Sequence, residues 1–245
     1  VTIGALVTWG VIALATHFPD WNALHFLRPA ERDAQPLSLQ SLFAGLKFVF
    51  KTDLILATIT LDLLAVFLGG AIALLPIFAQ DILQTGPRGL GVLRAAIPIG
   101  SFLMALAQAH RPPLKQAGKT LLWAVAGFGA ATIIFGLSRN SYLSFAMLVL
   151  CGAFDNISVI VRQALVQMLT PEEMRGRVSA VNVIFISSSN ELGEFESGVA
   201  AALLGTVPAV VVGGLGTILV VAAVAFLWPS LTRLGSLNEL KTRRL

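Results

Sequence analysis

Six long apolar runs constrain the fold of this chain more than any other feature of its sequence. The runs cover about residues 54–79, 89–109, 121–137, 142–169, 178–204 and 207–228, and short turns separate them. A helix needs roughly 20 apolar residues to cross the hydrocarbon core of a bilayer, and each run is close to that length or above it. We therefore predict an all-α, polytopic membrane protein whose residues 54–228 form a six-helix bundle.

The composition agrees with a membrane location. Of the 245 residues, 56% are hydrophobic and 12% are charged, and the mean hydropathy is +0.82, which is more apolar than a soluble domain. The single cysteine, Cys151, lies in an apolar run, which excludes a disulfide framework or a thiolate metal site. The sequence contains neither an HExxH motif nor a GxxxxGK[ST] phosphate-binding loop, so we expect no metal, cofactor or nucleotide.

The flanks of the bundle differ from it. Residues 1–18 are apolar and begin at Val1 without an initiator methionine, so we interpret them as the end of a preceding transmembrane helix in a longer protein. Residues 19–53 are predicted to be a linker that contains an interfacial helix, because apolar residues in 37–52 recur at helical spacing while Lys47 and Lys51 fall elsewhere. Residues 229–245 form a polar, basic tail.

The basic residues predict the orientation. If all six runs cross the bilayer, 13 of the 17 Lys and Arg residues lie on one side, in the linker, the loops near 110–119 and 175, and the tail. The opposite side has only Arg88 and Arg139. By the positive-inside rule the linker, both loops and the C-terminal tail are cytoplasmic. Because no basic patch with interleaved aromatic residues occurs, the net charge of +4 indicates membrane orientation and not a nucleic-acid partner.

The stretch 170–198 combines a helix start with an unusual load of acids. Thr170 can cap a helix, Pro171 suits its first position, and Glu173 completes a capping box. The run that follows carries Glu191, Glu194 and Glu196. A carboxylate at the bilayer centre costs roughly 2.5–3.5 kcal/mol on insertion scales. Three of them within six residues therefore predict a polar path for a substrate or a proton.

The other runs contain fewer ionisable residues. Asp155 and Arg162 share one stripe of the run 142–169, whereas Asp62 and Arg94 lie in the first and second runs. The runs thus hold five acids and two bases. A low dielectric and mutual repulsion disfavour the simultaneous ionisation of so many carboxyls, which makes some of them candidates for proton exchange.

We assign two sets of candidate site residues. The predicted substrate or proton path comprises Asp62, Arg94, Asp155, Arg162, Glu191 and Glu194, and the predicted gate or helix contacts are Arg175, Arg177 and Glu196. A purely structural reading stays open, in which Asp155 and Arg162 neutralise each other or a neighbour across helices, and Asp62 and Arg94 form structural pairs. A membrane-embedded enzyme that uses the Glu191 and Glu194 cluster is a second alternative, although no nucleophile with an evident base accompanies it. We predict that the chain is not an enzyme.

Several of these segments resemble one known family. The run TPEEMRGRVSAV (170–181), continued by SNELGEFESG (189–198), is similar to the C-terminal half of a major facilitator superfamily transporter, in the branch that includes bacterial enterobactin exporters and related efflux permeases. The segments GLKFV (45–49) and DNISVIVRQ (155–163) are similar to the same branch. The loop 110–119 stands where such transporters often carry a Gly-x-x-x-Asp-x-x-x-Gly-Arg-like gate motif, but it has no acid.

The resemblance implies a fold and a function. Residues 1–18 would be the sixth helix of the family and the six runs its seventh to twelfth, in a bacterial inner membrane. Two six-helix bundles would rock about a central site and export a small molecule, such as a siderophore or a drug, as protons enter. The implied partners are the bilayer, the cargo, protons and an N-terminal six-helix half. A non-transporting half-transporter remnant is the remaining alternative.

Overall fold

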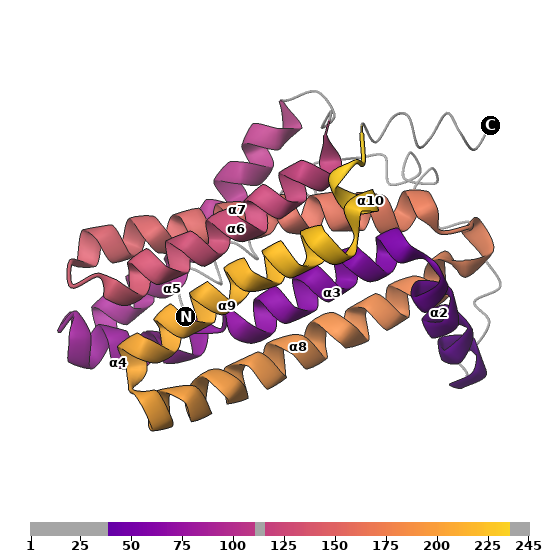
Figure 1. Cartoon of the computed structure of the whole chain (residues 1–245). Helices are drawn as coiled ribbons and strands as arrows, with labels where there is room; N and C mark the ends of the chain where they lie inside the picture. The colour runs from indigo at the N-terminus through magenta and orange to yellow at the C-terminus, as the bar shows by residue number, and fades with distance from the viewer. Residues whose placement is uncertain (1–38, 111–115, 236–245) are drawn as a thin grey trace, which may run out of the picture. The chain divides into compact units, whose positions relative to one another are not determined.

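A computed structural model describes residues 39–110 and 116–235 of the chain (Figure 1). Every regular element in these two ranges is a helix, so the predicted all-α class is confirmed. The predicted membrane helix over 1–18, the linker before residue 39 and the tail beyond residue 235 lie outside the described residues.

Six long helices form the bundle within the described ranges. They are α3 (Asp53–Leu68), α5 (Gly86–Ala109), α6 (Ala117–Leu137), α7 (Ser141–Leu169), α8 (Arg175–Leu204) and α9 (Thr206–Leu227). Shorter elements precede, connect or follow them, namely α2 (Leu39–Lys51), η2 (Ala71–Leu74), α4 (Leu75–Ile77), η3 (Phe78–Ile82), η4 (Glu172–Met174) and α10 (Pro229–Thr232).

Five helical stretches of the described chain are long and apolar enough to cross a membrane. They are Asp53–Ile82, Gly86–Ala109, Ala117–Leu137, Ser141–Leu169 and Thr206–Leu227. The sixth long helix, α8, has 30 residues but is not among them, because its Ser, Asn and Glu side chains lower its hydropathy. Polar side chains on a helix of this length need protein or water around them and not lipid.

The first predicted run is not one continuous α-helix. α3 ends at Leu68, and a 3-10 turn, a short α-helix and a π-helical turn carry the chain on to Ile82. Gly69 and Gly70 favour the break because glycine is a weak helix former. Pro76 adds to it because proline lacks the backbone N–H donor of a regular helix. A Cβ at Gly70 would lie 2.8 Å from the carbonyl oxygen of Gly193, so this break lets the chain approach α8 closely.

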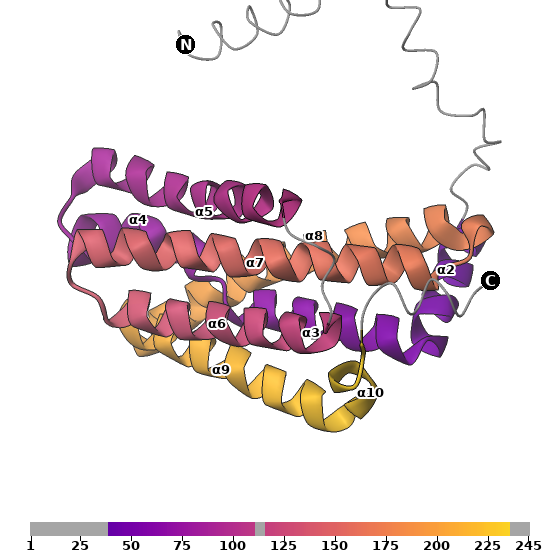
Figure 2. The ribbon, with the colours of Figure 1, turned by 90° about the horizontal axis from the view of Figure 1, so that it is seen from above.

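The helices pack in a definite order. α5 packs against α7, α7 against α6, α6 against α9, α9 against α3 and α3 against α8, and Figure 2 shows α5, α7, α6 and α9 side by side. Exchanging α3, α5 and α6 with α7, α8 and α9 converts the pair α5–α7 into α8–α3 and the pair α6–α7 into α9–α3. α3 and α7 thus hold corresponding positions, since α3 packs against α8 and α9 as α7 packs against α5 and α6.

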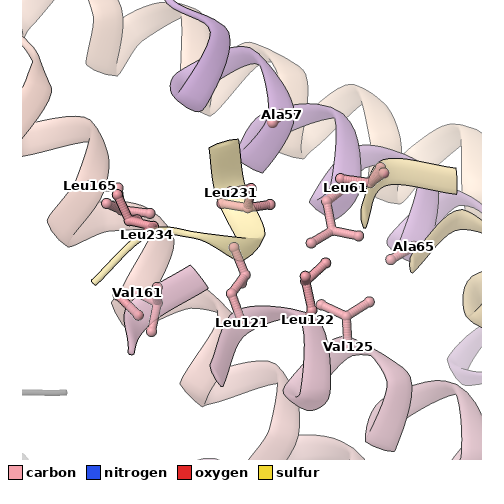
Figure 3. Close-up of a cluster of buried hydrophobic side chains, with 12 residues drawn as sticks. Ala57, Leu61, Ala65, Leu121, Leu122, Val125, Val161, Leu165, Leu231 and Leu234 are labelled. Carbon is pink, nitrogen blue, oxygen red and sulfur yellow. The ribbon is translucent and has the colours of Figure 1, made fainter. Parts of the chain in front are cut away.

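Buried apolar side chains fill the spaces between the helices. One cluster joins α3, α6, α7, α9 and α10, and Figure 3 shows Leu61, Leu121 and Leu231 within it. A second cluster lies around Phe78 and Phe135, whose ring centroids are 4.6 Å apart. Because lipid tails are as apolar as these side chains, close van der Waals packing and not transfer from water holds such helices together.

α2 packs across the beginning of α8. A Cβ at Gly45 would lie 2.8 Å from the backbone oxygen of Arg177, and Val49 is buried. Phe43 and Phe50 instead point outward, with 67% and 59% of their surface exposed. Exposed rings near exposed lysines suit the boundary between lipid and water, and the interfacial position of α2 stays a prediction.

Candidate functional site

A buried ion pair joins α3 to α7. Arg162 Nη2 lies 3.2 Å from Asp62 Oδ2, and both residues are buried. Arg162 Nη1 also donates a hydrogen bond to Asn182 Oδ1 on α8, at 3.1 Å. A planar guanidinium with five N–H donors can serve two such partners at once, so one side chain ties three helices together.

The positions of these residues along their helices explain why they meet. Asp62 lies nine residues after the start of α3, Asn182 lies seven residues after the start of α8, and Arg162 lies seven residues before the end of α7. At a rise of 1.5 Å per residue, all three side chains stand roughly 10–14 Å from the same end of the bundle. A further bond at 2.7 Å, from Ser189 Oγ to the Leu63 carbonyl oxygen, holds α8 against α3 beside them.

A small cavity lies next to the ion pair. It has a volume of about 20 Å³, and its polar lining comes from Asp62, Asp155 and Ser158. Apolar side chains complete the wall, among them Val66 and Phe128. One water molecule needs roughly 10–15 Å³ of such space and two to four polar partners, so the cavity can hold a single water.

A second, larger cavity of about 150 Å³ lies between α3, α6, α7 and α8. Asp155 and Glu194 bring two carboxyls to it, and Asn190 brings an amide. Much of the wall is apolar, with Phe128 and Val66 shared between the two cavities. Asp155 is the acid that lines both. The arrangement therefore places an amphipathic chamber beside a water-sized pocket and a buried ion pair.

The structure separates the three glutamates of α8. Glu191 and Glu194 are both exposed, Glu194 also lines the larger cavity, and Glu196 is half-buried on another side of the helix. Their spacing of three residues keeps Glu191 and Glu194 on neighbouring positions of one helix face, and their place on a substrate or proton path stays a prediction. Glu191 lies on the side of α8 that the bundle leaves open.

The predicted basic residues also occupy different surroundings. Arg94 is exposed on α5 and does not line either cavity. Arg175 pairs with Glu172 across the first turn before α8, with 3.3 Å between Nη1 and Oε1, and Arg177 Nη1 lies 3.7 Å from Met174 Sδ. These last two residues stand where α7 passes into α8, and their role as gate or helix contacts stays a prediction.

The structure decides which acid partners Arg162. Asp155 lies on the same stripe of α7 as Arg162. The carboxyl within ion-pair distance of Arg162 is nevertheless that of Asp62, on α3. Reasoning from the sequence did not assign Asn182 and Ser158 to the site. Each is a polar residue inside an apolar run, which the sequence does show. The sequence does not show which neighbouring helix such a residue contacts.

The described residues contain no group of three or more His, Cys, Asp or Glu side chains that could hold a metal ion. Cys151 is buried, and its Sγ lies 3.7 Å from Thr132 Oγ1 in the wall of the larger cavity. The chemistry that the site offers is therefore acid, amide and guanidinium chemistry at the centre of an apolar bundle.

This combination defines a class of protein. Long apolar helices with ionisable groups buried between them are typical of multi-pass membrane transport proteins. The chain belongs to the family described as transmembrane secretion effector, a member of the major facilitator superfamily, whose sequence model matches residues 1–242.

Curated relatives agree with this family. The chain is 30% identical over 173 residues to the enterobactin exporter EntS of Shigella flexneri, which covers 70% of this chain and 39% of the relative. It is 29% identical over 167 residues to EntS of Escherichia coli O1:K1, which covers 68% of this chain and 38% of the relative. The matched part thus spans about two fifths of the length of these relatives.

Proposed function

We propose that this chain is the C-terminal half of a secondary active efflux transporter, which exports a small molecule across the bacterial inner membrane in exchange for protons. The observation that carries the proposal is a line of polar groups, which runs from the exposed Glu194 through the half-buried Asp155 to the buried pair of Asp62 and Arg162. Ionisable groups buried within membrane helices mark ion and substrate paths. In this proposal the acids bind cargo or protons and perform no catalysis.

The open face of α8 supports a partner half. Ser187, Ser188, Asn190 and Glu191 are all exposed near the middle of this 30-residue helix. Lipid cannot solvate such groups at that depth, so they require protein or a water-filled cavity. An N-terminal six-helix bundle that closes over α8 would provide both, and transport would need the two halves together.

The orientation follows from charge. The start of α8 carries Arg175 and Arg177, and it shares its end of the bundle with α2, which carries Lys47 and Lys51. By the positive-inside rule this end is cytoplasmic, which also places the C-terminal tail in the cytoplasm.

Different observations favour two different classes of cargo. The relatives are named enterobactin exporters, which favours a siderophore. The larger cavity instead brings together Asp155 and Glu194 with a mostly apolar wall, which favours a lipophilic cation, since carboxylates attract positive charge. A transport assay with one probe of each kind separates the two.

The test is proton-driven uptake into inverted membrane vesicles that contain this chain joined to its N-terminal half. A catecholate siderophore and a lipophilic cationic dye serve as probes. We expect uptake of one probe in the wild type and uptake near background in Glu191→Gln, because Glu191 would face the cavity between the halves. Glu173→Gln, which changes an exposed acid in the turn before α8, should leave uptake unchanged.

Two outcomes would count against the proposal. Absence of uptake for both probes, in vesicles that hold the folded wild-type protein, would leave the fold without its assigned function. Full uptake in Glu191→Gln would remove Glu191 from the path.

A further inference from the structure

We propose that Asp62 and Asp155 form one proton-binding site, in which the two carboxyls share a single proton through a bridging water and Arg162 supplies the countercharge. The ligand is a proton delivered as hydronium. The site deepens the proposed transport function, since it identifies the groups that carry the coupled proton, but its geometry stands without any assumption about the cargo.

The first support is the shape of the small cavity. Its volume of about 20 Å³ suffices for one water and excludes a cargo molecule. Asp62, Asp155 and Ser158 are its polar lining residues, whereas the rest of its lining is apolar. A water there would have three polar partners, which is the usual number for a buried water. Such a water connects Asp62 on α3 with Asp155 on α7.

The second support is the charge balance around the two cavities. The titratable groups in their walls are Asp62 from α3, Asp155 and Cys151 from α7, and Glu194 from α8. The wall residues from α5 and α6 have no titratable side chain, and Arg162 is the cation beside the small cavity. Arg162 neutralises one carboxylate at 3.2 Å. The second carboxylate of the pair then has no cation of its own, and a low dielectric favours its neutralisation by a proton.

The third support is access. Asp155 lines the larger cavity as well as the small one, so it stands between the chamber and the ion pair. A hydronium in the chamber can transfer its proton to the Asp155 carboxylate and remain as water. The bridging water then accepts that proton and passes one of its own to Asp62. Release reverses these steps, so no other reactant is needed.

The site also connects proton binding to helix position. A proton on Asp62 cancels the charge that holds Arg162 to α3, while Asn182 of α8 keeps its hydrogen bond to the guanidinium. Within the described residues Arg162 Nε is buried without a hydrogen-bond partner, so the guanidinium has a donor to offer Asp155. Proton transfer from Asp155 to Asp62 would thus weaken the ion pair between Arg162 and Asp62 and strengthen the attraction of Arg162 to Asp155. The contact between α3 and α7 would become weaker.

The direct test is infrared difference spectroscopy of the purified chain in lipid bilayers during a pH change. We expect one protonated-carboxyl band per chain to titrate. Asp155→Asn and Asp62→Asn should each reduce this band to background, whereas Glu173→Gln, at an exposed acid outside the site, should retain it. Ser158→Ala keeps every charge and removes one partner of the water, so it should shift the frequency of the band. A band that survives both Asp variants, or that disappears in Glu173→Gln, would overturn the proposal. Circular dichroism confirms that each variant is folded.

A second arm keeps this inference separate from the proposed function. In vesicles with the assembled transporter, Asp155→Asn should abolish cargo uptake driven by a pH gradient but retain exchange of labelled for unlabelled cargo at equal pH. Continued gradient-driven uptake in Asp155→Asn would contradict the proton site. If the wild type moves no cargo while the infrared band behaves as expected, the proton site stands and the transport proposal fails.

Discussion

Arg162→Met is expected to lower the free energy of unfolding by about 3–5 kcal/mol, the usual cost of removing one partner from a buried ion pair. Methionine roughly preserves the length of the side chain, so lost packing contributes little. The variant leaves the Asp62 carboxylate buried without a countercharge and takes the donor from Asn182. Thermal unfolding in detergent, followed by size-exclusion chromatography, measures the loss.

A double variant tests the cause. In Asp62→Asn/Arg162→Met the uncompensated charge is absent, and replacement of a whole buried pair is often neutral, so most of the lost stability should return. Arg139→Met is the matched control at an exposed turn and should change stability by no more than about 0.5 kcal/mol. If the double variant is as unstable as Arg162→Met alone, the ion pair is not the origin of the effect.

Gly100→Ala is expected to destabilise the crossing of α5 and α7 by about 1–3 kcal/mol, through overpacking. A Cβ at Gly100 would collide with the carbonyl oxygen of Val149, and one at Gly152 would collide with that of Ile97. These atoms belong to the backbone, so the helices must separate to relieve the contact. Separation would also stretch the 3.0 Å hydrogen bond from Ser101 Oγ to the Gly152 carbonyl oxygen.

The same helix supplies the control for this variant. A Cβ at Gly91 would meet no atom within 4 Å among the described residues, so Gly91→Ala should stabilise α5 by up to about 1 kcal/mol through helix propensity. Thermal unfolding of the two variants should therefore move in opposite directions. Equal shifts would show that the α5–α7 contact is looser than the structure indicates.

The fold could be predicted from the sequence to the extent that the bilayer dictates it. Apolar length defines a membrane helix almost without regard to its neighbours, so the runs that became α5, α6, α7 and α9 were found with small errors at their ends. The break after Leu68 was not predicted, because hydropathy remains high through Gly69, Gly70 and Pro76. The close approach of Gly70 to the Gly193 carbonyl oxygen is a tertiary contact that hydropathy does not describe.

The site was predictable in composition but not in pairing. Helical periodicity placed Asp155 and Arg162 on one stripe of α7, and the structure puts both beside the small cavity. Periodicity assigns a residue to a face of its own helix only, so it could not say that Asp62, 100 positions away, would pair with Arg162. For the same reason, periodicity could not show that Asn182 of α8 accepts a hydrogen bond from Arg162. Arg94 is exposed on α5, and its place on the path stays a prediction.

The measurement that tests the central claim most directly is proton movement during transport. Inverted vesicles with an acidic interior and an internal pH-sensitive dye would receive the cargo that the uptake assay identifies. We expect the interior to lose acidity as the cargo enters with the wild type, and to show no cargo-dependent change with Asp155→Asn. Cargo accumulation that leaves the internal pH unchanged, or that persists after an ionophore has collapsed the gradient, would contradict proton-coupled efflux.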